Sequence, residues 1–455
     1  MDVDLDLVKK YNRPGPRYTS YPTVPHFRSS FGLEEWEAEI ELNNRENGRD
    51  LSLYFHIPFC DTLCWFCACT VVITRDPNRI DEYLNLLSGE INLVRERLRP
   101  GRKVVQLHFG GGTPTSLSPP QIRRLCDKIK ESFPFASDAE LGCEMDPRGL
   151  TLEHLKALRA AGFNRVSMGV QDFDPAVQKA IHRFNPPDLV QKCVHWIRSE
   201  GFESLNLDLI YGLPHQTVSS FEKTLEIILG LDPDRLAVYN YAHVPWLKVH
   251  QKLIHEEDLP RPEEKLSLLK VIIETLTSRG YVYIGMDHFA KPTDELTLAQ
   301  NKGTLQRNFQ GYSTKAGADI YAMGMSSISQ LERTYAQNFK ELSTYTSRVV
   351  EGKLPVEKGF VLSRDDRIRR EVIMRLMCDM SLDFRELSRG LEIDFTTYFE
   401  KELEHLSGFE SDGLIVTSQD DGFKVTDTGR LFVRNIAMVF DAYLDPSETR
   451  YSKTV

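Results

Sequence analysis

The feature that most constrains the fold is a regular alternation of short apolar segments and longer amphipathic segments between residues 51 and 286. Strand-like patterns occur at residues 51–57, 103–109, 140–145, 165–170, 205–210, 236–241 and 281–286. Helical periodicity lies between them, at residues 80–94, 119–132, 152–161, 175–181, 188–199, 219–229 and 262–278. Six or seven such units require parallel strands joined by right-handed crossovers. We therefore predict an α/β fold, with a doubly wound sheet as one possibility and a full or partial (β/α) barrel as the favoured one.

The segments on either side lack this alternation. Residues 1–50 are rich in proline and aromatic residues, and we expect them to form an irregular N-terminal arm on a barrel that spans residues 51–335. Residues 336–455 change to short helical patterns followed by two strands near 413–426, around an Asp421-Gly422 turn. This order predicts a mostly helical, winged-helix-like C-terminal domain. Acidic residues outnumber basic ones there, so a cap on the barrel is favoured over a DNA-binding role.

The cysteines are the strongest chemical signal. Four of the eight lie within ten residues that follow the first strand, at Cys60, Cys64, Cys67 and Cys69. The charged N-terminus does not resemble a secretory signal, so disulfides are not favoured. Structural zinc usually binds two separated cysteine pairs, and no second pair follows here. Three crowded thiols favour an iron–sulfur cluster, in which one iron would stay open to a ligand. Cys69 is left out of the ligand set and is interpreted as a buried thiol or a group near the site.

A glycine run follows the second strand. Residues 110–115 read Gly-Gly-Gly-Thr-Pro-Thr, and glycine lets the backbone approach a ligand closely, although a tight turn would explain the run equally well. The carboxyl ends of parallel strands meet on one face, where ligands bind in such folds. The cysteine loop and the glycine loop should therefore share one site.

Further motifs carry a family resemblance. With the two loops above, the segments HIPFC, FGGGTPT, EMDPR, RVSMGVQDF, NLDLIYGLP, YNYAHVP, IGMDHFA, RNFQGYST and YNRPGPRYTSYPT resemble the oxygen-independent coproporphyrinogen III oxidase family of the radical S-adenosylmethionine (SAM) superfamily. The likeness covers essentially the whole chain. It implies an oxidoreductase of haem biosynthesis with a [4Fe–4S] cluster and two molecules of SAM. SAM bound at the open iron would yield a radical that starts the oxidative decarboxylation of two propionates of coproporphyrinogen III to vinyl groups.

The resemblance also implies roles for individual residues. Cys60, Cys64 and Cys67 would ligate the cluster. Tyr54, Glu144, Phe309 and Gln310 would act at the catalytic centre. The SAM pocket would be formed by Tyr54, Phe66, Gly111, Gly112, Thr113, Glu144, Gln171, Arg183, Asp208, Ala242 and Ile328. Ordinary core or loop packing stays open as the alternative for the apolar and aromatic members of this set.

Charge and composition limit the partners. The 455 residues include 56 Lys and Arg against 66 Asp and Glu, a net charge of −10, which argues against a general nucleic-acid binder. No apolar run approaches the roughly 18 residues that a membrane helix needs. We expect a cytoplasmic monomer that takes electrons from a flavodoxin- or ferredoxin-like protein. An acidic protein needs a local basic patch for a substrate with four propionates, and Arg13, Arg17 and Arg307 are candidates.

Two alternatives belong to other functional classes. The first is a haem-binding sibling of the same superfamily, which would lack the Cys-x-Cys extension, the PGPRYTSYP arm and the RNFQGYST motif that this chain has. The second is an interaction module stabilised by zinc, which would bind zinc and would not cleave SAM.

Overall fold

The computed structural model describes residues 3–46, 48–418, 421–444 and 451–454. Its central element is a twelve-stranded sheet with the order β16-β15-β14-β13-β1-β4-β5-β6-β7-β8-β10-β9. The parallel strands are β1 (Leu51–Ile57), β4 (Val104–Gly111), β5 (Phe135–Met145), β6 (Arg165–Gln171), β7 (Ser204–Tyr211), β8 (Arg235–Asn240) and β13 (Asp319–Met323). In the described residues the two edge strands do not pair with each other, so the sheet forms a partial barrel. The predicted α/β class is confirmed.

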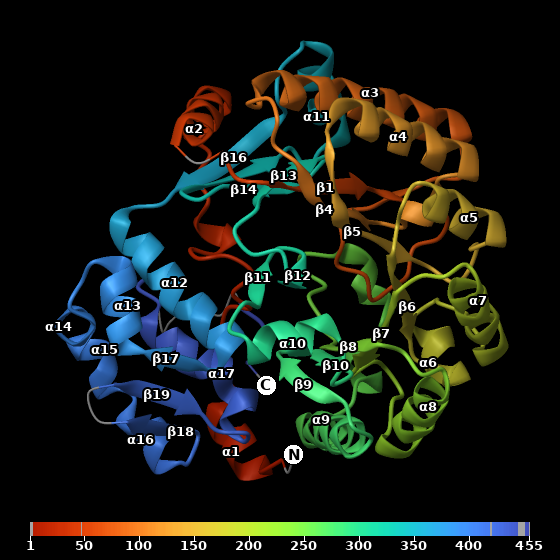
Figure 1. Ribbon diagram of the computed structural model, residues 1–455. Coiled ribbons are helices and arrows are strands. Elements are labelled where there is room, and N and C mark those ends of the chain that lie inside the picture. The colour runs from red at the N-terminus through yellow and green to blue at the C-terminus, as the bar shows by residue number, and fades with distance from the viewer. Residues whose placement is uncertain (1–2, 47, 419–420, 445–450, 455) are drawn as a thin grey trace.

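Helices follow the parallel strands and cover the outer face of the sheet (Figure 1). They are α3 (Pro77–Arg97), α4 (Pro119–Ser132), α5 (Leu152–Ala160), α6 (Pro175–Ala180), α7 (Pro187–Ser199), α8 (Val218–Gly230) and α9 (Pro262–Ser278). The predicted bounds of α4 and α9 agree with the structure. Proline in the first turn sets the start of both helices, and Gly280 ends the second with a φ of +89°.

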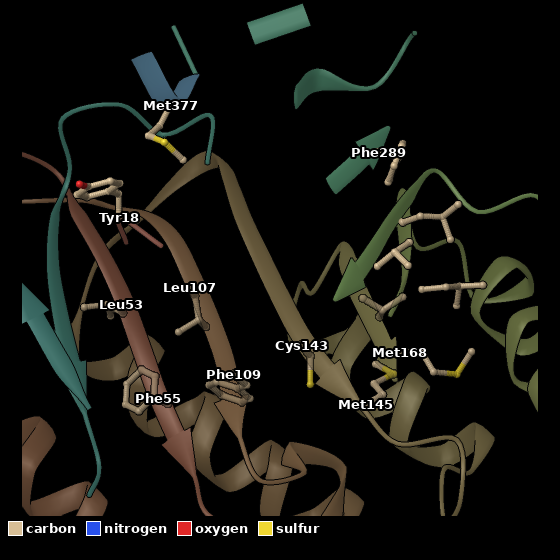
Figure 2. Packing of buried hydrophobic residues seen from close by; sticks show 14 of the residues in the cluster. Tyr18, Leu53, Phe55, Leu107, Phe109, Cys143, Met145, Met168, Phe289 and Met377 are labelled. Carbon is tan, nitrogen blue, oxygen red and sulfur yellow. The ribbon is translucent and has the colours of Figure 1, made fainter. Parts of the chain in front are cut away.

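The core lies between the sheet and these helices. Side chains of a strand alternate between two faces, and one set packs outward, including Leu53, Phe55, Leu107, Phe109 and Met145 (Figure 2). The Phe55 and Phe109 rings meet edge to face with centroids 5.7 Å apart. Each buried side chain of this size contributes about 1.5–3 kcal/mol. The other set faces the barrel interior and is polar.

The strand predicted at residues 281–286 forms, but not as a barrel strand. β9 (Val282–Gly285) reverses through Met286, whose φ is +55°, and pairs antiparallel with β10 (His288–Ala290), which lies between β8 and β9. The seventh parallel strand is instead β13, on the far side of β1. The sheet continues antiparallel through β14 (Ile328–Gln330), β15 (Thr334–Asn338) and β16 (Val356–Val361).

The N-terminal arm is more regular than predicted. It contains α1 (Leu5–Tyr11) and α2 (Leu33–Glu46), and the expectation of an irregular segment is wrong there because Trp36 and Ile40 on α2 give it an apolar face to bury. Between the helices the chain crosses to the C-terminal region, where Pro14 pairs with Lys453, and then to the sheet edge, where Arg28 pairs with Gly359.

The C-terminal region is mostly helical, as predicted. It consists of α12 (Arg364–Asp379), α13 (Phe384–Leu391), α14 (Phe395–Tyr398), α15 (Glu400–Glu404), α16 (Ser407–Ser411) and α17 (Val433–Ala437). A small antiparallel sheet has the order β17 (Ser381–Asp383), β19 (Gly422–Val425) and β18 (Ile415–Ser418). The predicted hairpin corresponds to β18 and β19, and residues 419–420 of its turn lie outside the described residues.

The remaining strands and α-helices lie outside the twelve-stranded sheet and the C-terminal region. They are β2 (Phe59–Cys60), β3 (Val72–Ile73), α10 (Glu295–Asn301), β11 (Gln306–Asn308), β12 (Gly311–Ser313) and α11 (Leu342–Val350). The β11–β12 hairpin lies inside the open barrel, next to α12 and the parallel strands (Figure 1). Over the described residues, no helix has the length and apolar character needed to cross a membrane.

Candidate active site

The cysteine loop begins where β1 ends. β2 and β3 pair in parallel and close the loop at its base. The Cys60 Sγ lies 3.4 Å from the Thr113 hydroxyl, and the Cys64 Sγ accepts a hydrogen bond of 3.2 Å from Arg148. The Cys67 Sγ accepts one of 3.4 Å from the backbone N–H of Cys69. Guanidinium and N–H donors aimed at sulfur suit thiolates that carry the charge of a bound cluster.

The thiols differ in acidity. Burial raises the pKa of Cys60 to about 11. The hydrogen bond from Cys69 lowers the pKa of Cys67 to about 6, against the opposing effect of burial. The same interaction raises the pKa of Cys69 well above its usual value. Cys69 is an exposed residue, so the expectation of a buried thiol is wrong, and it stays a group near the site. Cys69 therefore acts on the Cys67 sulfur through its backbone N–H and its thiol.

Residues that the sequence did not single out fix the loop. After β8, the chain turns through a 3₁₀ segment, Val249–Leu253, whose side chains bond to backbone carbonyls of the cysteine loop. Gln251 donates to the Phe66 carbonyl at 2.9 Å, the His250 Nε2 lies 2.7 Å from the Cys67 carbonyl, and Lys248 donates to that of Cys69 at 3.0 Å. These bonds set the backbone path of the loop.

The glycine loop packs directly on the cysteine loop. Gly112 donates to the Ile57 carbonyl at 2.8 Å, which continues the β1–β4 pairing beyond β4. A Cβ at Gly112 would lie 2.6 Å from the Pro58 carbonyl oxygen. Gly111 has a φ of +118°, and a Cβ there would lie 2.9 Å from the His56 ring. The close approach of the two loops therefore requires glycine at both positions.

A cluster of polar side chains from β1, β4 and β5 lies in the barrel interior. The His108 Nε2 lies 3.3 Å from Glu144 Oε1, and Gly111 donates to Glu144 Oε2 at 3.3 Å. The Tyr54 ring stacks on His108, with centroids 6.0 Å apart. Burial raises the pKa of Glu144, but the hydrogen bond and charge of His108 more than offset it, so the pKa lies below its usual value. Glu144 is thus an ionised acceptor for an ammonium or hydroxyl group.

Gln171, Arg183 and Asp208 gather at the ends of β6 and β7. Arg183 donates to the Gly169 carbonyl at 2.5 Å and pairs with Asp146 at 3.0 Å. Within the described residues, the buried Gln171 Oε1 and Arg183 Nε have no hydrogen-bond partner. Burial and the charge of Glu144 raise the pKa of Asp208 to about 7. Unpartnered buried polar atoms beside ionisable groups are typical of a site that awaits a polar ligand.

The remaining predicted residues lie in two places. Phe66 packs in an apolar cluster with Tyr241. The Gln251 side-chain amide, which donates to the Phe66 carbonyl, also donates to the Ala242 carbonyl at 3.3 Å. Phe309 and Ile328 pack against one cluster around Tyr335 and Phe360. Gln310 lies in the turn of the β11–β12 hairpin, and its buried Nε2 has no partner in the described part of the chain. Phe66 and Ala242 thus share Gln251 as a hydrogen-bond donor, and Phe309 and Ile328 share one apolar cluster.

The donor set fits an iron–sulfur cube better than a single ion. Across the described residues, no three His, Cys, Asp or Glu side chains group closely enough to hold one metal ion. In a cube each cysteine binds its own iron, so the thiols need not converge on one point. Three thiols crowded in one short loop are the donor set that such a cluster uses. All eight cysteines are free thiols.

A separate cavity of about 600 Å³ opens between the cysteine loop and the first turns of α3 and α4. Cys60, Thr113 and Arg148 are among its lining residues, whereas Tyr54 and Glu144 are not. The polar group described above therefore faces the barrel interior rather than this cavity.

Comparison with known proteins identifies the family. The family model of the radical SAM superfamily matches residues 54–228, and that of the HemN C-terminal domain matches residues 362–432. The oxygen-independent coproporphyrinogen III oxidase of Helicobacter pylori strain J99 is 47% identical over 455 residues, which cover 100% of this chain and 99% of the relative. The Escherichia coli K12 protein of the same name is 47% identical over 444 residues, which cover 98% of this chain and 96% of that relative. This chain belongs to the oxygen-independent coproporphyrinogen III oxidase family.

The fold agrees with that assignment. The solved structure of coproporphyrinogen III oxidase (HemN) from Escherichia coli, described as a radical SAM enzyme, matches with a TM-score of 0.92 and 45% identity. The match covers 98% of this chain and 100% of that one. Membership of the radical SAM superfamily implies a [4Fe–4S] cluster and SAM as the cofactors.

Proposed function

We propose that this protein is a radical SAM oxidoreductase that converts two propionate side chains of coproporphyrinogen III to vinyl groups and so forms protoporphyrinogen IX. At each propionate a hydrogen atom is removed from the β-carbon, the bond to the carboxylate breaks, carbon dioxide leaves, and one electron passes to an external acceptor. The observation that carries the proposal is the three-cysteine loop at the end of β1, set beside an interior lined by ionised and unpartnered polar groups, in a chain 47% identical to enzymes of that name.

The cluster would be held by Cys60, Cys64 and Cys67. When bound, the cluster and SAM supply one-electron chemistry, in which cleavage of SAM yields a hydrogen-abstracting radical. The guanidinium of Arg148, which donates to Cys64, would offset the negative charge of the thiolate ligands. The Cys69 N–H and thiol would do the same at Cys67.

The interior residues would bind and orient SAM. Glu144, kept ionised by His108, would accept hydrogen bonds from an ammonium or ribose hydroxyl, with Tyr54 beside it. Gln171 and Arg183 would serve SAM through their polar atoms that have no protein partner in the described residues, and Asp208, held by Ser167 and Asn206, would lie beside them. The same set includes Phe66, Gly111, Gly112, Thr113, Ala242 and Ile328. Phe309 and Gln310 would close the catalytic centre from the hairpin.

Finer assignments complete the proposal. We propose that residues 1–50, 51–335 and 336–455 act as arm, catalytic barrel and cap, although the barrel sheet continues past residue 335 through the rest of β15 and through β16. We further propose that the protein works in the cytoplasm as a monomer, with a flavodoxin- or ferredoxin-like electron donor. The free state of all eight thiols supports a reducing compartment.

An anaerobic assay tests this function. Protein purified without oxygen should carry about four iron and four sulfide. With reductant, SAM and coproporphyrinogen III it should release 5′-deoxyadenosine and the divinyl product, identified by mass. Cys64→Ser should lose the cluster and turnover, whereas Cys126→Ser, at a buried cysteine on α4, should retain both. Intact cluster and SAM cleavage without decarboxylation would refute the oxidase function and favour the haem-binding sibling.

A further inference from the structure

The β11–β12 hairpin carries a buried arginine into the barrel. Arg307 pairs with Tyr312 across the hairpin, and its guanidinium lies 4.8 Å from the centre of that ring. Arg307 is only 6% exposed. Its Nε donates to the Arg17 carbonyl at 3.4 Å, but its buried Nη1 has no partner within the described residues. An unpaired buried donor of this kind is costly unless a ligand satisfies it.

A second arginine approaches from the N-terminal arm. The Arg17 side chain runs to the same region, where its guanidinium lies 6.0 Å from the centre of the Tyr239 ring. It pairs with Asp287, in the turn between β9 and β10. Among the described residues, Asp287 is the carboxylate that pairs with Arg17. Arg17 therefore has a carboxylate partner, whereas the Arg307 guanidinium has none in the described residues.

The neighbouring groups do not remove this excess of positive charge. Burial, together with the charges of Arg307 and Arg17, lowers the pKa of His288 to about 3, so that ring is neutral. Arg434 on α17 is committed to the arm and the C-terminal segment, since it donates to the carbonyls of Gly15, Pro16, Lys453 and Thr454.

The excess charge lies in the same interior as the polar group at the strand ends. Burial and the charges of Asp208 and Glu144 raise the pKa of Tyr239, while the charges of Arg17 and Arg307 lower it, so all four charged groups act at this one buried residue. Arg17 lies over the Tyr239 ring, on the strand next to the one that carries Asp208, and Arg307 is bonded to Arg17, so both arginines adjoin the interior that the polar residues line.

We propose that Arg307 and Arg17 form a carboxylate-binding recess that holds a propionate of the tetrapyrrole substrate while another propionate reacts. The recess rests on the proposed function, because the occupant is a side chain of that substrate. A guanidinium presents paired donors that match a carboxylate, and the anion would satisfy the Arg307 Nη1 and balance the buried charge. Arg13, the third candidate from the sequence, has an exposed side chain and does not contribute.

Fluorescence titration of the cluster-loaded protein tests the recess. Coproporphyrin III serves as the probe, and its tetramethyl ester, which lacks the negative charges, serves as the matched ligand. Arg307→Gln should weaken binding of the free acid about tenfold to hundredfold, equivalent to about 1.4–2.8 kcal/mol, and should leave binding of the ester within about twofold. Arg307→Lys should recover part of the affinity. Arg13→Gln should match the wild type with both probes.

The outcomes separate the recess from the function. Unchanged binding of the free acid to Arg307→Gln, or equal weakening of acid and ester, would overturn the recess. Iron content and melting temperature report whether the variant folds, and Arg17→Gln asks the same question if Arg307→Gln does not load its cluster. If the wild type binds the acid more tightly than the ester but decarboxylates nothing, the recess stands and the proposed reaction fails.

Discussion

Arg102 and Asp319 form a buried ion pair whose loss should have a large, measurable cost. The two side chains are 2% and 1% exposed, and Asn43 on α2 adds a hydrogen bond of 2.6 Å to the same carboxylate oxygen. Arg102 also donates to the Arg49 carbonyl at 2.5 Å. The pair joins α2, the start of β4 and the start of β13. Arg102→Met would leave the Asp319 carboxylate buried without its charge partner, which costs about 3–5 kcal/mol.

Thermal unfolding of the anaerobic protein measures that cost. Unfolding entropy scales with length, and 455 residues correspond to about 1 kcal/mol/K. If the chain unfolds as one unit, Arg102→Met should lower the melting temperature by about 3–5 °C. The double variant Arg102→Met with Asp319→Leu should recover at least half of the loss, because no charge is left unpaired. Arg124→Met, in an exposed pair with Asp81, is the control and should cost under about 1 kcal/mol. An Arg102→Met shift no larger than the control would refute the reasoning.

Three further predictions follow from buried contacts. Burial raises the pKa of Glu90 on α3 to about 7, above the roughly 4.3 of an unfolded chain, so the stability present at acidic pH should decline as the pH rises through about 7. Melts of Glu90→Gln across that range should lack this decline, and an equal slope would contradict the assignment. Gln251→Leu removes three hydrogen bonds, two donated to the Phe66 and Ala242 carbonyls and one accepted from the Val244 N–H. It should cost about 1–3 kcal/mol and speed the loss of iron, whereas an unchanged iron half-life would count against its role. Gly112→Ala places a Cβ 2.6 Å from the Pro58 carbonyl oxygen, so it should cost about 1–3 kcal/mol and lower the iron content of the purified protein. The control Gly390→Ala has open space around its Cβ and should do neither. Equal iron content in the two variants would contradict the packing argument.

Much of the barrel could be predicted because its signals are local. Period-two and period-3.6 patterns located β1 and β4 to β8, and proline and glycine located the ends of α4 and α9. β13 was missed because Asp319–Met323 is a five-residue strand in a glycine-rich stretch, with no crossover pattern of its own. The antiparallel direction of β9 was missed for a different reason. It depends on a chain reversal at Met286, a residue type that does not usually mark a left-handed turn.

The site shows the same division. The position of the cysteine loop was predictable because it follows a strand that must lie in the sheet. The contacts of Lys248, His250 and Gln251 with that loop could not be predicted. These side chains bond to backbone carbonyls, and such bonds leave no pattern in the sequence of the loop. The guanidinium of Arg148 at Cys64 is a similar case, since it depends on how the segment after β5 folds back.

The openness of the sheet connects these observations. A closed barrel of eight strands fills its interior with packed side chains and leaves no room for a large ligand. Here the parallel strands stop at seven, and the inner face carries Tyr54, His108, Glu144 and other polar groups instead of an apolar filling. The opening is occupied by the β11–β12 hairpin and by the arm, which Arg434 ties to the C-terminal region. The hairpin and the arm are also the elements that supply Arg307 and Arg17. The open edge therefore admits the two elements that bring buried positive charge to the interior, which a closed barrel would exclude.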